Sequence, residues 1–326
     1  MRTQQQLKSV LQENPNDFEA LYELSKVFND EKQFAASFAM CDRAVTSYEA
    51  TPNPAHKAQF FEIKRLHVLH QKEHLDDILG PAIHLIDPKW VPVYRNGRPR
   101  EMSWNIVASN LNNIPSALAA PQLRKLRFLS ININDRPNET TTALANSSLS
   151  QIRSLSLNYK VQPDLPVFTK FLAAKTEDFQ CITSLSITMP RIDDNLASKI
   201  RAAFGTLESF SLTSLDRTGI TQDFCDTLAD DHRSCSLTRL ALVGTSIGNE
   251  GLFAIIESKN FPSLQALDLH DGVLNNGAAK ILAATDNLPA LRSLDLRFNQ
   301  IDPAGLDMLK KCSLKCTADN QHRRPA

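Results

Sequence analysis

The chain has 326 residues and no formal net charge, because 36 lysine and arginine residues balance 36 aspartate and glutamate residues. Charged residues make up 22% and hydrophobic residues 42% of the chain, which is typical of a folded globular protein and excludes a disordered one. Neither half is basic, so the composition argues against nucleic acid or an anionic membrane surface as the partner. No apolar run approaches the roughly 18 residues that a membrane span needs.

The sequence begins without the apolar segment of a signal peptide, since residues 1–6 lead directly into an amphipathic helical pattern. Six cysteines are scattered along the chain without a CxxC pair, so we expect reduced and mostly buried thiols. Cys312 and Cys316 could form half of a metal site, but no second half exists, and a final strand through Cys316 is favoured. These features predict a cytoplasmic protein.

Residues 3–86 predict helices separated by short breaks, because apolar residues recur at helical spacing. A first apolar stripe ends at Pro15, a second begins after a helix cap at Asp17, and further helical segments continue to residue 86. We therefore assign residues 1–99 to an all-α N-terminal domain.

One of these helices carries a possible metal motif. His70, Glu73 and His74 match the H-x-x-E-H pattern, in which two histidines bind zinc and the glutamate acts as the base. The alternative is a solvated face of a charged helix, which we favour because the domain is far smaller than such peptidases and no third ligand can be named. A zinc-dependent hydrolase is thus a remote alternative, and we expect neither a metal nor a cofactor.

Residues 100–125 are expected to join the helical domain to a repeat array that starts at residue 126. Met102 and Trp104 alternate with polar residues, so both lie on one face of a strand. Trp104 precedes Ile131 by 27 residues, which matches one period of the array. We expect a degenerate repeat that caps the array, since an open end would expose the core.

From residue 126 onward, seven segments share the frame apolar-x-x-apolar-x-apolar. Their first residues are spaced by 26, 30, 25, 30, 27 and 27 residues, and all 21 framed positions are Leu, Ile or Phe. Such a period is typical of a solenoid of stacked units. The frames are Leu126/Leu129/Ile131, Ile152/Leu155/Leu157, Ile182/Leu185/Ile187, Leu207/Phe210/Leu212, Leu237/Leu240/Leu242, Leu264/Leu267/Leu269 and Leu291/Leu294/Leu296.

Each frame predicts a short strand, then a loop and a returning helix. Strand side chains alternate, so the apolar-x-apolar pair points to one face. One unit cannot bury that face alone, and neighbouring units therefore stack into a parallel inner sheet with helices outside. The predicted fold class is α/β: an all-α domain and then a solenoid of about seven repeats with a C-terminal cap over residues 126–326.

The last three units resemble leucine-rich repeats of the ribonuclease-inhibitor-like subclass. The resemblance rests on residues 247–251, 274–277 and 301–305, each with a glycine where that subclass opens its helix. Such repeats have Asn or Cys at one loop position. In this chain two repeats have asparagine there, Asn134 and Asn299, and the other repeats have different residue types. We therefore expect an incomplete ladder of buried asparagines.

The N-terminal domain has two resemblances of its own. Residues 19–44 resemble a tetratricopeptide helix pair. More of the domain resembles the helical repeat-companion domain that precedes leucine-rich repeats in some bacterial proteins, on residues 11–17, 74–81, Trp90 and the 95–98 turn. The second resemblance implies a bacterial origin and a cap for the solenoid, and it brings no settled activity.

The side chains between the framed leucines point away from the core, onto the inner face of the array. In the middle repeats they are mostly small hydroxyls, which suit a crowded curve. Towards the C-terminus they include charged and aromatic residues of the kind that binding sites favour, although a charged stripe can also be merely solvated. The candidate partner-binding residues are Tyr159, Arg239, Asp268, His270, Asp271, Asp295, Arg297 and Phe298.

No Gly-rich phosphate loop, serine-hydrolase elbow or kinase signature is present, so we expect neither catalysis nor a small-molecule substrate. The favoured function is a non-catalytic scaffold that binds a protein partner on the concave face. The alternative is a regulator of an enzyme, such as an inhibitor or a GTPase-activating protein, because ribonuclease-inhibitor-like arrays include both.

Overall fold

The computed structural model describes residues 2–86, 93–95, 98–106, 109–217, 219–284, 287–310, 315–318 and 321. Two compact units are present, one formed by residues 1–104 and 112–128 and the other by residues 105–111 and 129–326. Among the described helices, none has the length and apolar character needed to cross a membrane. Trp90 and part of the 95–98 turn lie outside the described residues.

The first unit begins with a set of packed helices. The predicted cap at Asp17 is confirmed, because its carboxylate accepts a hydrogen bond from the Ala20 amide at 2.8 Å. Thr3 and Gln6 form a reciprocal capping box at the first helix. The apolar stripes meet in a core that includes Leu21, Cys41 and other buried side chains. The helices are α1 (Gln4–Glu13), α2 (Phe18–Asp30), α3 (Phe34–Ala50), α4 (Lys57–Glu73) and α5 (Leu75–Leu79), with 3-10 turns η1 (Pro54–His56) and η2 (Gly80–Leu85).

A hairpin and a short helix follow in the chain. Strands β1 (Val93–Arg95) and β2 (Arg98–Ile106) pair antiparallel. Met102 and Trp104 are buried in β2, on the face that their alternation predicts. Helix α6 (Ile114–Ala119) comes next, flanked by the 3-10 turns η3 (Leu111–Asn113) and η4 (Pro121–Leu123).

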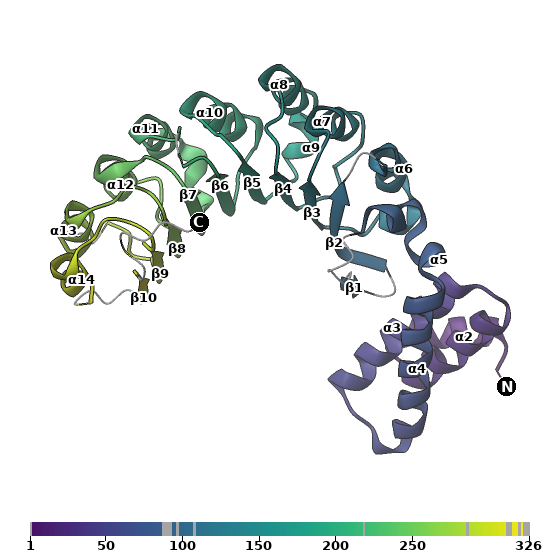
Figure 1. Ribbon diagram of the computed structural model, residues 1–326. Helices are drawn as coiled ribbons and strands as arrows, with labels where there is room; N and C mark the ends of the chain where they lie inside the picture. Colours follow the sequence, from purple (N-terminus) through teal and green to yellow (C-terminus); the bar gives the residue numbers. More distant parts are fainter. Residues whose placement is uncertain are drawn as a thin grey trace. The chain divides into compact units, whose positions relative to one another are not determined.

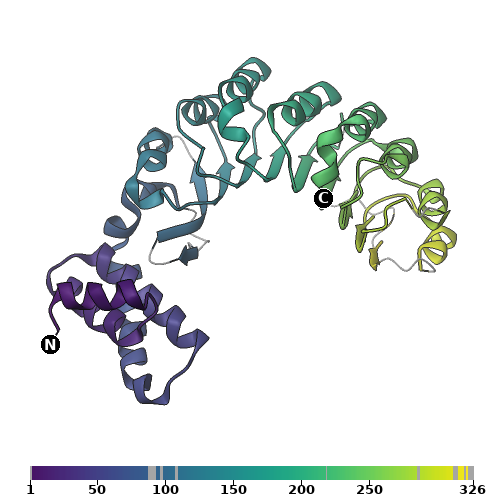
Figure 2. The same ribbon diagram turned by 180° about the vertical axis from the view of Figure 1, so that it is seen from behind.

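The second unit is a curved array in which a returning segment connects each strand to the next. Its strands line the inner side of the arc and its longer helices the outer side, as Figures 1 and 2 show from opposite directions. The strands are β3 (Phe128–Ile133), β4 (Ser154–Tyr159), β5 (Ser184–Met189), β6 (Ser209–Ser214), β7 (Arg239–Val243), β8 (Ala266–Asp268), β9 (Ser293–Asp295) and β10 (Lys315–Thr317). The helices are α7 (Pro137–Ala145), α8 (Leu165–Ala174), α9 (Thr176–Phe179), α10 (Asp194–Ala203), α11 (Gln222–Asp230), α12 (Gly248–Glu257), α13 (Asn276–Ala284) and α14 (Pro303–Lys310), with the 3-10 turn η5 (His232–Ser236).

The strands pair in parallel and in the register that the repeat frame demands. Leu155 aligns with Leu185, and the same column continues through the central framed residue of each later strand to Cys316 of β10. All 21 framed residues are buried. The predicted α/β class and the solenoid of stacked units are therefore confirmed. Burial of each framed leucine stabilises the array by roughly 1.5–3 kcal/mol.

The asparagine ladder is formed at one of its two expected positions. Asn299 is buried, and its amide nitrogen donates to the carbonyls of Leu269 and Leu296 at 2.9 and 3.0 Å. Its side-chain oxygen accepts from the amides of Gly272 and Leu274, both at 2.9 Å. Asn134 is only half-buried and donates to the Asn105 side chain instead.

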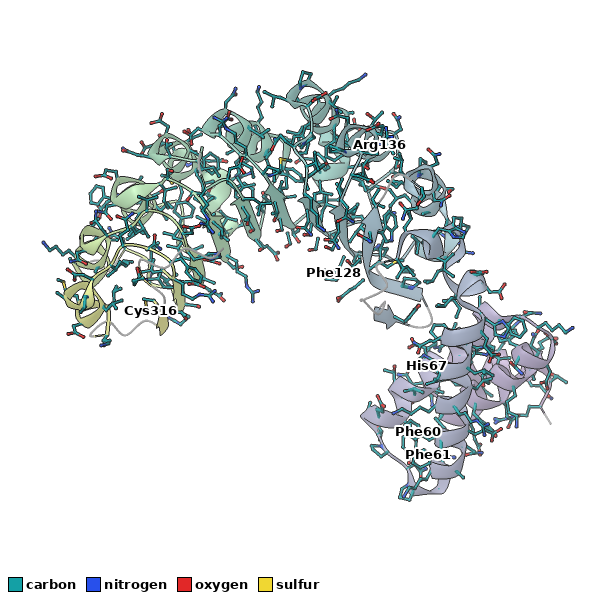
Figure 3. The ribbon with its side chains drawn as sticks, viewed as in Figure 1. Phe60, Phe61, His67, Phe128, Arg136 and Cys316 are labelled. Atoms are coloured by element: carbon teal, nitrogen blue, oxygen red, sulfur yellow. The ribbon has the colours of Figure 1, made fainter. Side chains whose placement is uncertain are left out.

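The expectation of mostly buried thiols is wrong for the described cysteines. Cys41 and Cys225 are buried, Cys181 and Cys316 are half-buried, and Cys235 is exposed in η5. Burial raises the pKa of the Cys41 thiol to about 12. The strand through Cys316 is present as β10 (Figure 3), whereas Cys312 lies outside the described residues.

Candidate partner-binding site

Seven of the eight candidate residues lie in the three repeats that contain β7, β8 and β9. We call this set the C-terminal patch. It consists of Arg239, Asp268, His270, Asp271, Asp295, Arg297 and Phe298, all of which are exposed or half-buried.

The eighth candidate, Tyr159, does not belong to a surface, and this prediction is wrong. Its side chain is 1% exposed, and its hydroxyl shares a hydrogen bond with Thr141 at 2.9 Å. Its ring packs edge to face against Phe168. Burial raises the pKa of the Tyr159 hydroxyl. Strand β4 continues to Tyr159, so the alternation that buries Leu157 also turns Tyr159 into the core.

Phe298 stands at the same place in its repeat, two residues after the last framed leucine, and yet it reaches the surface. Strand β9 ends at Asp295, and Phe298 adopts a left-handed backbone with φ of 59°. Gly244 and Asp271 occupy this position in the two preceding repeats and are left-handed too, with φ of 63° and 56°. The left-handed residue breaks the alternation and therefore re-aims the side chain.

Two of the three aspartates of the patch, Asp268 and Asp295, lie side by side. Asp268 closes β8 and Asp295 closes β9, and they are paired in register. Asp268 accepts hydrogen bonds from the backbone amide of His270 at 3.1 Å and interacts with its Nδ1 atom at 2.7 Å. Asp295 accepts from the Arg297 amide at 3.0 Å, and from Arg297 Nε and Nη2 at 2.9 and 2.6 Å. Both repeats thus use one motif, in which an aspartate holds the residue two positions later.

These contacts set the ionisation of the patch. The hydrogen bond to Asp268 raises the pKa of His270, and it outweighs the burial that lowers it. Burial raises the pKa of Asp295, but the hydrogen bonds and the charge of Arg297, together with the charge of His270, leave this pKa below its usual value. The neighbouring carboxylates of Asp268 and Asp295 therefore each pair with a basic side chain, His270 and Arg297 respectively.

One charged neighbour of the patch is missing from the sequence prediction. Arg217, in the loop after β6, forms an ion pair with Asp271 at 2.7 Å between Nε and Oδ2. Its backbone is also left-handed, with φ of 57°. Loops after parallel strands meet at one edge of the sheet, and this rule is the signal that could have pointed to Arg217.

Arg239 and Phe298 give the patch its remaining character. Arg239 is exposed and lies in register with Ala266 on β8. The Phe298 ring lies 6.4 Å from the His270 ring, centre to centre, at 68° to it. The patch thus combines charged groups held in place with one partly exposed aromatic ring.

The three residues of the histidine motif have different surroundings within the first unit. His70 is fully buried, and its Nε2 atom lies 2.9 Å from the Ser37 hydroxyl, which donates to the Ser25 carbonyl at 2.8 Å. His74 stacks on Phe34, whereas Glu73 is exposed. Burial, reinforced by the neighbouring histidines, lowers the pKa of His70 to about 4. The favoured solvated-face interpretation is therefore wrong, because His70 is a core residue joined to α3.

The first unit also has a hollow of about 500 Å³ between α2 and α4. Its lining includes Tyr22, Lys26, Glu62 and the partly exposed Leu69. An ion pair spans the hollow, with 3.0 Å between Lys26 Nζ and Glu62 Oε1. Phe61, labelled on α4 in Figure 3, is 59% exposed. This surface is a second place where a partner could dock.

Comparisons with known proteins agree with this architecture. A family model described as Leucine Rich repeat matches residues 233–255 and 287–310. A crystal structure of a Bacteroides fragilis protein is similar with a TM-score of 0.50 and 14% identity, over 78% of this chain and 73% of that chain. The yeast complex of Rad7 and Elc1 contains a chain with 12% identity over 99% of this chain and 98% of that chain, at a TM-score of 0.31, which carries no structural argument. No curated protein sequence matches the chain. The family model thus matches two segments of the array, and the similar structure agrees with its repeated strand-and-helix fold.

Proposed function

We propose that the protein is a non-catalytic scaffold that binds another protein through the C-terminal patch. The observation that carries this proposal is the arrangement of its charges. His270, Arg297 and Asp271 are each held by a hydrogen bond or ion pair within the array. Side chains that are already ordered lose little conformational entropy when a partner binds. A cytoplasmic location and a bacterial origin complete the proposal.

The composition of the patch supports a protein partner. Arginine and aromatic residues contribute most to binding at protein interfaces, and Arg239, Arg297 and Phe298 supply both kinds. The patch carries both signs of charge, which favours a partner with a mixed charge pattern over a polyanion.

The experiment compares two versions of the full-length protein in affinity capture and then in binding measurements with the purified partner. A triple variant, Arg239→Ala, Arg297→Ala and Phe298→Ala, is expected to weaken binding at least tenfold. Arg136→Ala is the matched control, since Arg136 lies on the outer, helical side of the array and pairs with Glu139 (Figure 3). Unchanged affinity in a triple variant that melts normally would exclude the patch and direct attention to the hollow between α2 and α4.

A second candidate is regulation of a partner enzyme, and Arg239 is the observation that favours it. An exposed arginine on the inner face can reach into a partner's active site and interact with its anionic groups. If this holds, Arg239→Ala changes the turnover of the captured partner enzyme while leaving its affinity within a few-fold. Equal turnover with both versions would leave the scaffold role alone.

A further inference from the structure

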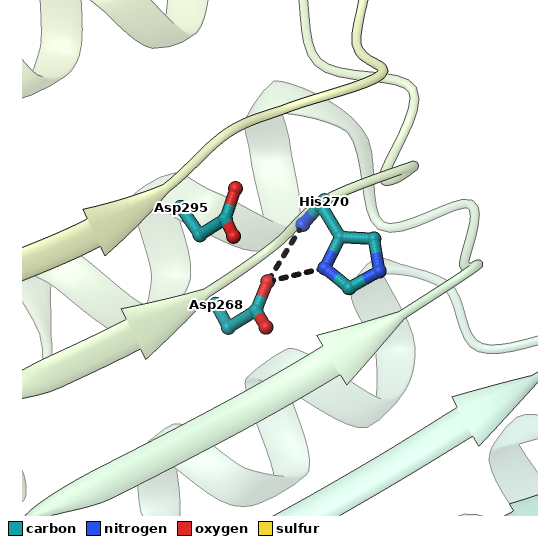
Figure 4. Close-up of side chains that lie close together, drawn as sticks. All are labelled: Asp268, His270 and Asp295. Carbon is teal, nitrogen blue, oxygen red and sulfur yellow. Dashed lines mark hydrogen bonds and ion pairs between the residues drawn. The ribbon is translucent and has the colours of Figure 1, made fainter. Parts of the chain in front are cut away.

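We propose that Asp268, His270 and Asp295 form a binding site for a divalent transition-metal ion on the inner side of the last repeats. One donor atom from each residue lies within 4.8 Å of the other two. Figure 4 shows the two carboxylates from neighbouring strands and the imidazole that comes shortly after one of them in the chain. The proposal does not depend on the protein partner, and it goes against the sequence-based expectation of no metal.

The donor set defines the class of ion. Two carboxylate oxygens and one imidazole nitrogen suit Zn²⁺, Mn²⁺, Fe²⁺ or Co²⁺, whereas Ca²⁺ and Mg²⁺ prefer oxygen donors alone. Donor atoms bound to such an ion at about 2.0–2.2 Å lie roughly 3–4 Å apart, so the three side chains need only small movements to close around it. Asp268 and Asp295 are aligned by the register of β8 and β9, which places both carboxylates before any ion arrives.

The repeat array itself shows that these residues are not required by the fold. The positions equivalent to Asp268 and Asp295 in the five preceding strands are small and uncharged. The positions equivalent to His270 and Arg297 hold amides, hydroxyls or valine in those strands. The residues at the first position are Ser130, Ser156, Ser186, Ser211 and Ala241, and those at the second are Asn132, Asn158, Thr188, Thr213 and Val243. The two aspartates and the histidine therefore occur only in the adjacent repeats of β8 and β9, whereas the earlier strands have neutral side chains at these positions.

Access and support also fit an ion. The side chains of Asp268, His270 and Asp295 are 35%, 27% and 20% exposed, so an ion can enter from solvent without unfolding the array. Arg297 holds Asp295 through Nε and Nη2, and in metal sites such outer hydrogen bonds orient the ligands. Three protein donors leave coordination positions open for water or for a group of a partner.

The alternative is a patch satisfied by its own ion pairs, with Asp268 matched by His270 and Asp295 by Arg297. The two ideas differ over metal binding by the parent protein, because a metal site requires the parent to bind an ion. In a patch that has only ion pairs, no variant binds metal.

The experiment uses tag-free, chelator-treated full-length protein titrated with Zn²⁺ and Mn²⁺ by calorimetry, and with Co²⁺ by visible absorption. We expect one ion per chain for the parent protein, and at least a tenfold loss of affinity in each of Asp268→Asn, His270→Gln and Asp295→Asn. His232→Gln and His74→Gln are the controls, because His232 is an exposed histidine of η5 and His74 belongs to the first unit. Both controls should bind like the parent, with the same Co²⁺ spectrum.

Melting curves without metal identify any variant that fails to fold, and the three near-isosteric changes provide independent readings of one site. Absence of binding by the parent protein up to millimolar Zn²⁺, Mn²⁺ and Co²⁺ would overturn the proposal. Binding that survives in all three variants, or that falls equally in the His232 and His74 controls, would show adventitious binding to surface histidines and would overturn it as well.

Discussion

Single residues decide where the strands of the second unit end. The second position after the last framed leucine is extended and buried at Tyr159 but left-handed at Gly244, Asp271 and Phe298. Left-handed backbone costs a non-glycine residue about 1–2 kcal/mol, so two of these three repeats hold strain that glycine avoids. The same left-handed turn exposes the side chains of Asp271 and Phe298, which both belong to the C-terminal patch.

Gly244 provides a test of this position. A Cβ atom there would clash with the Ser214 carbonyl oxygen, in addition to the cost of φ at 63°. Gly244→Ala should therefore lower the free energy of unfolding by about 2–4 kcal/mol. Gly248→Ala is the matched control, because its φ is also 63° but its Cβ would meet only the flexible Glu250 carboxylate at 3.2 Å. Urea denaturation of both variants measures the difference, and equal losses would show that the Ser214 contact costs nothing.

His70 provides a second test at this scale, through the dependence of stability on pH. Its pKa is about 4 in the folded protein, mainly because of burial, and about 6.5 in an unfolded chain. The unfolded chain therefore takes up a proton first as the pH falls below 6.5, and stability is lost between pH 6.5 and 4. Between pH 7 and pH 5 the loss should be on the order of 1–2 kcal/mol.

His70→Gln keeps a polar partner for Ser37 but cannot be protonated, so it removes this part of the pH dependence. Urea denaturation of the parent and the variant at pH 7, 6 and 5 checks the prediction, since the two proteins differ in this one side chain. Parallel pH profiles for the two proteins would contradict the assigned role of His70.

At the scale of elements, neighbouring repeats are joined by polar groups as well as by leucines. Arg201 of α10 is 2% exposed, and its guanidinium lies 3.0 Å from the carboxylate of Asp231, which directly succeeds α11. It also donates to the carbonyl of Gly205 at 3.0 Å. Asp231 in turn pairs with Arg233 at 2.9 Å. A buried charge thus links the end of one helix to the end of the next.

Breaking this link should be costly, because a buried charge without its partner is strongly destabilising. We expect Asp231→Asn to lower the free energy of unfolding by about 3–5 kcal/mol. The double variant Arg201→Met and Asp231→Asn should recover part of the loss, since the apolar side chain leaves no charge to compensate. A double-mutant cycle by urea denaturation measures the coupling. Additive losses in the cycle would mean that the two residues act independently.

At the scale of the whole molecule, the chain consists of two units whose stability has different origins. The helices of the first unit pack around local core clusters, whereas each repeat of the second unit contacts mainly its neighbours. Stability in such an array is a sum of repeats and of the interfaces between them, so damage spreads along it from one repeat to the next.

Leu267 tests this organisation, because it occupies the central framed position of β8 and is 1% exposed. Leu267→Ala should cost about 2–5 kcal/mol and accelerate amide hydrogen exchange in β7, β8 and β9, while α2 and α3 stay protected. Ser293→Ala, at an exposed position of β9, should change stability by less than about 0.5 kcal/mol. Hydrogen exchange with mass spectrometry separates the units. Uniform acceleration across the whole chain would mean that both units unfold as one.

The sequence by itself determined the repeating architecture, because the spacing of the framed leucines allows only one face of each strand to be buried. Tyr159 obeys the same alternation, and treating it as a surface residue departed from a rule that the sequence already contained. His70 was misjudged because helical spacing places it near charged residues, whereas its burial depends on where Ser37 and Phe34 lie on another helix. Only the tertiary structure decided which residues of the patch contact one another. The register of β8 and β9 brings Asp268 beside Asp295, and the loop after β6 brings Arg217 to Asp271, through contacts between residues 27 and 54 positions apart that no local pattern specifies.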